Sequence, residues 1–277
     1  MNIGIVGLGL IGGSLAKSAK KNTDFRVYGA NRSRSVVDYA LLSGIIDEEL
    51  NEKTVKDCDI IFVSLYPDAT IRYIEDNARL FKKDAIIIDC AGVKRAVCEK
   101  GFQLAGEYGF TFIGGHPMAG TQYSGIKNAK DTMFRAATFV LVPKQDEEVA
   151  ILSKARDAII SIGFARITIM NAEKHDRLIA FTSQLAHVVS NAYVKSPSAN
   201  EHNGISAGSY KDLTRVAYLN ENMWTELFMD NGDNLVRELD GIINELSKYR
   251  DAIKANDPDT LRQLLKEGCE AKERIDS

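Results

Sequence analysis

The feature that most constrains this fold is a glycine-rich turn close to the start of the chain. Residues 3–6 (IGIV) are apolar apart from one glycine and predict a buried strand, and the pattern Gly7-x-Gly9-x-x-Gly12 follows directly. A helix is predicted over 14–21, so the turn stands between a strand and a helix. The first glycine permits the tight turn, the second lets a pyrophosphate approach the backbone, and the third lets the helix pack on the strand. This context predicts a dinucleotide-binding unit.

The start of that helix is the second part of the predicted cofactor site. Backbone N–H groups in a helix's first turn have no partner inside the helix, and together with the helix dipole they attract an anion. We therefore expect the cofactor's phosphates beside Gly7, Gly9, Leu10, Ile11 and Gly12. A glycine-rich turn without a ligand is the alternative interpretation.

The residues after the second predicted strand, 26–30, indicate which dinucleotide binds. NAD enzymes usually place Asp or Glu there to accept hydrogen bonds from the ribose hydroxyls. This chain instead has Asn31, Arg32, Ser33 and Arg34, so no carboxylate repels a 2′-phosphate and two guanidinium groups are available to pair with one. The pattern favours NADP over NAD. The alternative is a solvated basic turn, with Asn31 bound to an unphosphorylated ribose.

Strands and helices continue to alternate as far as residue 170. The further predicted strands have the ranges 59–65, 85–89, 110–113, 138–143 and 165–169. Such alternation is typical of an α/β domain with a Rossmann-type, doubly wound parallel sheet. Ligands of open α/β sheets bind beside the carboxyl ends of the strands, so we expect Ser64, Leu65 and Gly92 in the cofactor site.

The stretch 114–125 is too irregular for a helix or a strand interior. It holds four glycines and a proline, which predicts a loop at the C-terminal end of a strand. His116 lies within it, and an unperturbed histidine exchanges a proton near neutral pH. The glycines have no evident packing task in the sequence, so we expect them to let a ligand approach His116 closely.

After residue 170 only helices are predicted. The chain therefore divides into a dinucleotide-binding domain, 1–170, and an all-α domain, 171–277. Between Leu235 and Ile253 the apolar residues recur in alternating steps of four and three, which is a heptad pattern. A helix buried within its own subunit is one explanation. We favour a homodimer joined through the all-α domain.

One face of the helix predicted over 172–194 is polar. Gln184, His187 and Asn191 share this face because they are spaced by three and by four residues. Arg215 follows on the next helix, after a loop over 196–209. His187 and Arg215 are therefore candidates to bind a ligand, although each on its own has an ordinary structural explanation.

The composition limits the possible partners. The 277 residues are 45% hydrophobic and 26% charged, with a net charge of −3, which is typical of a globular protein and argues against nucleic acid or an anionic membrane as partner. No apolar stretch approaches the roughly 20 residues of a membrane span. The four cysteines show no spacing typical of a zinc site. We expect a cytoplasmic protein that binds a small molecule and no metal.

Several segments, in order, resemble the prephenate/arogenate dehydrogenases of tyrosine biosynthesis. They are the turn 7–12 (GLGLIG), residues 115–120 (GHPMAG), residues 183–187 (SQLAH) and residues 211–215 (KDLTR). The HPMAG and KDLTR segments are far more specific than the glycine turn, and the resemblance spans nearly the whole chain. It implies oxidative decarboxylation of prephenate to 4-hydroxyphenylpyruvate and CO₂. Arogenate, which would give tyrosine directly, stays open as the alternative substrate.

The resemblance also implies roles for single residues. His116 is the expected general base that takes the proton of the substrate's C4 hydroxyl while hydride passes from C4 to the nicotinamide. Arg215, which offers a fork of donors for a carboxylate, and His187 are expected to bind the two ends of this dianionic substrate, and which end each of them binds stays open. Further substrate contacts are expected from Thr121, Gln122 and Lys211.

Two positions depart from the family pattern. Gly92 stands where relatives commonly carry a serine that hydrogen-bonds the catalytic histidine, so water, Thr121 or a backbone group is expected to orient His116. Gln122 stands where many relatives have Glu, so an acidic gate is not expected.

Two other functions stay open. A β-hydroxyacid dehydrogenase is disfavoured because the helix over 172–194 carries a lysine only near its start, at Lys174. A non-catalytic NADP-binding sensor or scaffold, with the heptad helix as its docking element, would leave His116, His187 and Arg215 unexplained together.

Overall fold

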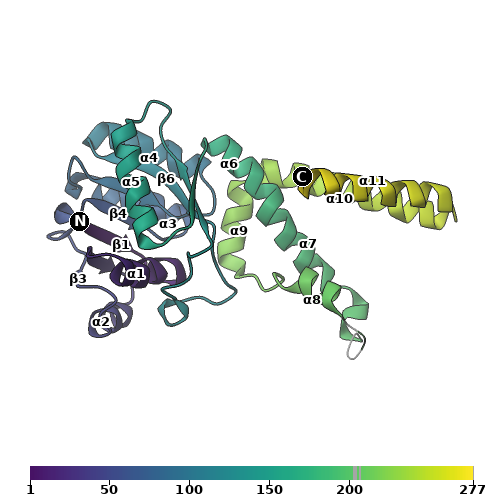
Figure 1. The fold of residues 1–277 in the computed structure, drawn as a ribbon, viewed down its shortest axis with the longest axis horizontal. Helices are drawn as coiled ribbons and strands as arrows, with labels where there is room; N and C mark the ends of the chain where they lie inside the picture. The colour runs from purple at the N-terminus through teal and green to yellow at the C-terminus, as the bar shows by residue number, and fades with distance from the viewer. Residues whose placement is uncertain (202–204, 206, 277) are drawn as a thin grey trace.

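The computed structural model describes residues 1–201, 205 and 207–276, and it consists of a sheet flanked by helices followed by a group of helices (Figure 1). Within these residues the sheet has eight strands, in the order β3-β2-β1-β4-β5-β6-β7-β8. The strands are β1 (Asn2–Val6), β2 (Arg26–Ala30), β3 (Glu48–Glu49), β4 (Ile60–Val63), β5 (Ile86–Asp89), β6 (Thr111–Pro117), β7 (Thr138–Val142) and β8 (Arg166–Ile169). The predicted Rossmann-type domain followed by an all-α domain is confirmed.

The direction of the strands differs from the expected parallel sheet at one edge. Neighbouring strands from β3 to β6 pair in parallel, whereas β7 runs antiparallel to β6, and β8 is parallel to β7. A parallel pair needs a long crossover, usually a helix. The segment between β6 and β7 forms only the short turn η3 (Ile126–Asn128), so the chain returns along β6 in the opposite direction.

Helices cover both faces of the sheet. They are α1 (Leu10–Asn22), α2 (Arg34–Leu42), α3 (Pro67–Asn77), α4 (Arg95–Tyr108) and α5 (Val149–Ile162), with the short turns η1 (Val55–Asp57) and η2 (Ala78–Leu80). Buried residues of α1 and α5 join one hydrophobic core, and those of α3 and α4 join the other. This two-sided cover explains the nearly continuous apolar strands.

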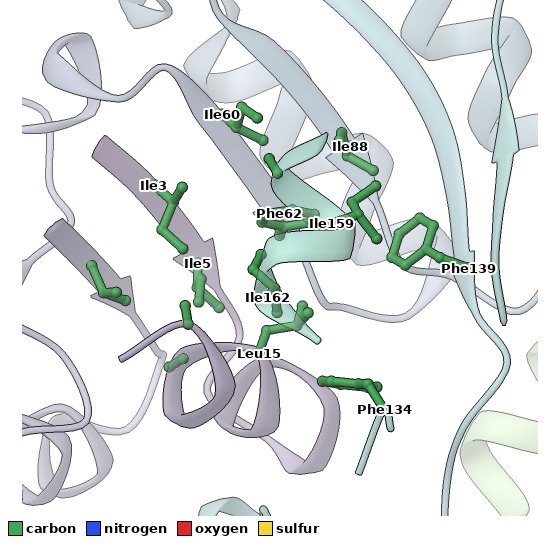
Figure 2. Packing of buried hydrophobic residues seen from close by; sticks show 14 of the residues in the cluster. Ile3, Ile5, Leu15, Ile60, Phe62, Ile88, Phe134, Phe139, Ile159 and Ile162 are labelled. Carbon is green, nitrogen blue, oxygen red and sulfur yellow. The ribbon is translucent and has the colours of Figure 1, made fainter. Parts of the chain in front are cut away.

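Strand β4 contributes to both cores because its side chains alternate between the two faces. Ile60 and Phe62 belong to the core below α1 and α5, and Ile61 and Val63 belong to the opposite core. Figure 2 shows the first core, in which Phe62 meets Phe139 of β7 edge to face at 6.5 Å between ring centroids. Burying each such side chain contributes about 1.5–3 kcal/mol.

The second part of the chain is helical. Its elements are α6 (Ala172–Ile179), the π-helical segment η4 (Ala180–Leu185), α7 (Ala186–Tyr193), the turn η5 (Pro197–Asn200), α8 (Gly208–Thr214), α9 (Glu221–Asp230), α10 (Gly232–Lys254) and α11 (Pro258–Asp276). The single helix predicted over 172–194 is therefore interrupted by one π-helical stretch. Part of the predicted loop 196–209, residues 202–204 and 206, lies outside the described residues.

Helices α10 and α11 form an arm that extends away from the sheet (Figure 1). The heptad seam is buried only near its start: the exposed fraction is 4% for Leu235 but 59% for Leu246 and 63% for Ile253. Within one subunit, the outer half of the seam is therefore uncovered. In the part of the chain that the structure describes, no helix is long and apolar enough to cross a membrane.

Candidate active site

The glycine turn has the geometry that a dinucleotide requires. Gly7 has a φ of +87°, and a Cβ there would lie 2.4 Å from the carbonyl oxygen of Ser64, while a Cβ at Gly12 would lie 2.0 Å from the Gly7 oxygen. Neither position accepts a side chain. At Gly9, by contrast, a Cβ would meet nothing within 4 Å, so the backbone there borders open space.

The helix that follows is suited to an anion. Helix α1 begins at Leu10, its N-cap Gly9 provides no side-chain hydrogen bond, and its first turn has no acidic residue. The N–H groups of that turn therefore have no side-chain cap, and no acidic side chain of the turn itself competes for the positive end of the helix dipole. Leu65, another predicted contact, packs against the turn, since its Cδ2 would lie 2.8 Å from a Cβ at Gly7. The residues present fit a dinucleotide.

The predicted ribose-binding residues after β2 differ in how far their side chains are already engaged by other protein groups. The Asn31 side-chain oxygen accepts a hydrogen bond from the Leu8 N–H at 3.1 Å, so it is bound to the glycine turn. Arg34 pairs with Asp38 and Glu49 instead of facing solvent alone. Arg32 and Ser33 are exposed, and Ser33 Oγ lies 2.9 Å from Ser35 Oγ. Arg32 is thus the more available of the two arginines.

His116 lies in a strand, and the predicted loop over 114–125 is wrong for its first four residues. Strand β6 continues through Pro117, where it pairs antiparallel with β7 and places His116 opposite Val140. The glycines before His116 have a packing role that the sequence did not reveal. A Cβ at Gly114 would lie 2.5 Å from Cys98 Sγ, and one at Gly115 would lie 2.3 Å from the Asp89 carbonyl oxygen.

The imidazole of His116 is held by a second histidine. Its Nδ1 lies 2.9 Å from Nε2 of His175, and Nδ1 of His175 lies 2.7 Å from a carboxylate oxygen of Asp176. His175 and Asp176 are buried at the start of α6. The expected orienting groups, namely water, Thr121 or a backbone group, are therefore replaced by His175.

Asp176 fixes the hydrogen-bonded pair of histidines to the sheet domain. Its carboxylate accepts hydrogen bonds from the backbone N–H groups of Lys94 (2.7 Å) and Arg95 (2.9 Å) at the start of α4. The Lys94 ammonium forms a fully buried ion pair with Asp89 at the end of β5. Asp89 also accepts from the N–H of Gly115, the residue before His116. His116 is thus tied to α4, α6 and β5 at once.

Burial and neighbouring charges set the protonation states of His116, His175 and Asp176. Burial, His175 and the Lys94 ammonium together lower the pKa of His116 well below 6.5. Burial lowers the pKa of His175 more than the hydrogen bond with Asp176 raises it. Burial raises the pKa of Asp176, but the hydrogen bonds from His175 and from the backbone at Arg95 and Lys94 lower it further, below its ordinary value. At neutral pH both histidines are neutral and Asp176 is ionised.

The loop that carries Gly92 is covered by the helical part. A Cβ on Gly92 would lie 3.0 Å from Cδ2 of Leu227 in α9, which is tighter than ordinary van der Waals contact. Gln184 holds α9 in place, because its side-chain amide donates to the Leu227 carbonyl at 2.8 Å and its oxygen accepts from Asn231 at 2.8 Å. Gln184 is a buried structural residue and not part of an open polar face.

His187 forms a second, separate group. Its ring packs at a tilt against Trp224, with 4.1 Å between centroids, and its Nδ1 lies 2.8 Å from the Ser183 carbonyl oxygen, to which it donates. Burial lowers the pKa of His187, and the hydrogen bond to Ser183 raises it less, while the Arg215 guanidinium lowers it further. Neutral His187 therefore presents Nε2 as an acceptor, and it donates from Nε2 only when protonated. Arg215 itself is exposed.

The structure does not bring together all the predicted substrate residues. In the described part of the chain, no hydrogen bond or ring contact joins His116 to His187 or Arg215. Among the described residues Thr121 bonds only to Tyr123, and both Gln122 and Lys211 are exposed.

His175 and Asp176 are the site residues that sequence reasoning missed. The adjacent His and Asp at the start of the first helix after the sheet were the available signal. The described residues contain no group of three or more His, Cys, Asp or Glu side chains placed to hold a metal ion.

The fold and this site define a dinucleotide-dependent dehydrogenase with a nucleotide-binding domain and a helical domain. Residues 15–168 match the model of the prephenate dehydrogenase nucleotide-binding domain, and residues 171–267 match that of the prephenate dehydrogenase dimerization domain. The chain therefore belongs to the prephenate dehydrogenase family.

Individual relatives agree with this assignment. Prephenate dehydrogenase of Bacillus subtilis is 28% identical over 95% of this chain and 72% of its own length. Among solved structures, prephenate dehydrogenase from Aquifex aeolicus, in complex with hydroxyphenyl propionate and NAD⁺, is 26% identical with a TM-score of 0.86, covering 99% of this chain and 98% of that one. Synechocystis arogenate dehydrogenase is 27% identical with a TM-score of 0.83, covering 99% of this chain and 100% of that one.

Proposed function

We propose that this protein oxidatively decarboxylates prephenate to 4-hydroxyphenylpyruvate and CO₂, with His116 as the general base. The observation that carries the proposal is the state of His116, a neutral imidazole with Nδ1 engaged and Nε2 without a partner among the described residues. Such a nitrogen is prepared to accept the proton of a substrate hydroxyl.

In the proposed reaction, the C4 hydroxyl gives its proton to His116 Nε2 as hydride leaves C4. The bound nicotinamide supplies the hydride acceptor. Breaking the bond to the ring carboxylate moves an electron pair into the ring, which becomes aromatic as CO₂ leaves. His116 then returns its proton to the phenolate oxygen. Arg215 is proposed to pair with a substrate carboxylate, and Thr121, Gln122 and Lys211 stay predicted substrate contacts.

The test of this role is His116→Asn. We expect kcat to fall about 10²-fold or more, because the general base is lost, while cofactor binding measured by fluorescence quenching is unchanged. Full turnover by the variant would remove His116 from the mechanism. A non-catalytic scaffold instead predicts cofactor binding without turnover in the unaltered protein, and no cost from Arg215→Ala.

Arogenate is the second candidate substrate, and one observation favours it. Neutral His187 offers Nε2 as an acceptor, which suits the ammonium group of arogenate better than the keto group of prephenate. The similarity to Synechocystis arogenate dehydrogenase points the same way. Comparing kcat/KM for the two substrates, by following NAD(P)H absorbance, decides between them.

For the cofactor we propose NADP over NAD, with Arg32 as the main partner of the 2′-phosphate. The support is its exposed position and the lack of a carboxylate over 31–34, whereas Arg34 already pairs with Asp38 and Glu49. We expect Arg32→Ala to raise the KM for NADP about tenfold, as loss of one charged hydrogen bond predicts, and to leave the KM for NAD unchanged. A strong NAD preference in the unaltered protein would contradict the proposal.

We also propose a homodimer formed through α10 and α11, and a domain boundary between residues 170 and 171. The support is the exposed apolar seam and the match of residues 171–267 to a family dimerization domain. Sedimentation equilibrium should give the mass of two chains. The cytoplasmic location expected from the sequence stays a prediction.

A further inference from the structure

The site contains a buried histidine for which the proposed reaction has no task. His175 does not face the substrate directly; it stands between His116 and Asp176, with 2.9 Å to His116 Nδ1 and 2.7 Å to Asp176. Its side chain is 1% exposed. Each ring nitrogen of His175 therefore has one partner. The Asp176 carboxylate can only accept a hydrogen bond, whereas the His116 nitrogen can donate or accept one.

The chemistry of the two ends decides where the protons lie. The ionised Asp176 carboxylate only accepts hydrogen bonds, so Nδ1 of His175 carries the proton between them. Neutral His175 then has a lone pair on Nε2, and the contact with His116 requires the proton to be on His116 Nδ1. The remaining lone pair of His116 is thereby assigned to Nε2.

We propose that His175 is a positioning residue that holds the Nδ1–H tautomer of His116 and so directs the Nε2 lone pair to the substrate hydroxyl. This inference rests on the proposed function, since it explains how the proposed base is prepared. When His116 takes the substrate's proton, its Nδ1–H bond to His175 also stabilises the imidazolium that forms. The arrangement serves the same purpose as the orienting carboxylate of a Ser-His-Asp triad.

The surroundings hold His175 in this orientation. Asp176 is bound by two backbone N–H groups at the start of α4, so it cannot turn away from His175. The other charged groups near the two imidazoles are Lys94, from the start of α4, and Asp89, from the end of β5, which form a buried ion pair, and Arg95, whose Nε lies 3.5 Å from a carboxylate oxygen of Asp176. The carboxylate that His175 meets directly is thus Asp176.

Two replacements of His175 separate positioning from simple packing. His175→Leu fills much of the space but offers no acceptor to His116 Nδ1, whereas His175→Gln offers its side-chain oxygen. We expect the Leu variant to lose about 10²-fold in kcat, with the substrate KM and the cofactor Kd changed less than about threefold. The Gln variant should recover to within about tenfold of the unaltered enzyme. Lys174→Ala, an exposed change on the same turn of α6, is the matched control and should leave kcat unchanged.

A second measurement does not depend on turnover. The chain has four histidines, so ¹⁵N NMR of histidine-labelled protein can assign each ring by single replacement. At pH 8 we expect the His116 proton on Nδ1 in the unaltered and Gln proteins, and on Nε2 or shared between the nitrogens in the Leu variant. A proton on Nε2 of His116 in the unaltered protein would overturn the inference, as would full kcat in the Leu variant. If the unaltered protein turns over neither substrate, the proposed function fails, and the NMR result still decides the tautomer.

Discussion

The two histidine groups of this protein are built in different ways. His116 lies where the sheet meets α4 and α6. Its partner His175 is in turn hydrogen-bonded to the buried carboxylate of Asp176. His187 lies in α7, where its ring rests on Trp224 and an exposed guanidinium, Arg215, stands near it.

The difference reflects what each group is proposed to do. A general base must keep its proton on one nitrogen and its lone pair in one direction, and buried hydrogen bonds provide that rigidity. A group that binds a substrate's charge must stay accessible, since the ligand itself supplies the missing partner. Replacements that distinguish buried from exposed charges are therefore the sharpest tests of the comparison.

The largest effect is expected from Lys94→Met, which leaves Asp89 buried without its partner. Breaking a buried pair from one side costs about 3–5 kcal/mol, so the free energy of unfolding in urea should fall by that amount. Lys82→Met is the matched control, because its ion pair with Asp59 is partly exposed and is worth about 1 kcal/mol or less. Equal losses in the two variants would show that burial of the first pair has no energetic consequence.

A smaller effect, on binding alone, is expected from Arg215→Ala. Loss of a charge-assisted hydrogen bond to a carboxylate costs about 1.5–3 kcal/mol, so the substrate KM should rise about 10- to 100-fold while kcat changes little. Arg156→Ala removes an exposed arginine of α5 that pairs with its neighbour Asp157, and it serves as the control. A fall in kcat with unchanged KM would place Arg215 with the catalytic group instead.

The smallest expected effect is on the pH dependence of the rate, whose acid limb should lie below the ordinary histidine pKa of 6.5. The proposed base must be neutral to accept a proton, and burial, His175 and Lys94 lower the pKa of His116 well below 6.5. The rate should therefore rise with pH through a pKa below 6.5 and be level between pH 7 and 8. Steady-state rates measured from pH 5 to 8 test this.

The same profile in Arg215→Ala sharpens the comparison. Arg215 lowers the pKa of His187 but is not among the charges that act on His116. The acid limb of kcat should therefore stay where it is in the unaltered protein. A limb centred at or above 6.5 in either protein would contradict a neutral His116.

Much of the fold was predictable because it depends on local patterns. The strand before Gly7, the turn itself and the start of α1 follow from glycine spacing and from apolar runs a few residues long. His116 was recognisable as the candidate base because its surroundings in the sequence are unusual. The π-helical stretch at 180–185 and the extension of β6 over 114–117 were not predictable, since each depends on what packs against it.

Most of the remaining differences involve contacts between distant residues. His116 and His175 are 59 positions apart, and Lys94 meets Asp176 across 82 positions. Arg34, which the sequence offered to a phosphate, is paired with Glu49 through the neighbouring strand β3. No spacing rule connects such residues, because their distance depends on how whole elements dock.

By itself, the sequence determined the dinucleotide turn, the alternation of strands and helices, and which histidine is the candidate base, since these depend on periodicity and residue type. Only the tertiary structure decided what holds that histidine. The helix that carries His175 and Asp176 has to dock on the start of α4 before the His116 imidazole gains a partner. The absence of a serine at position 92 was visible in the sequence, but the group that takes its place exists only in the folded chain.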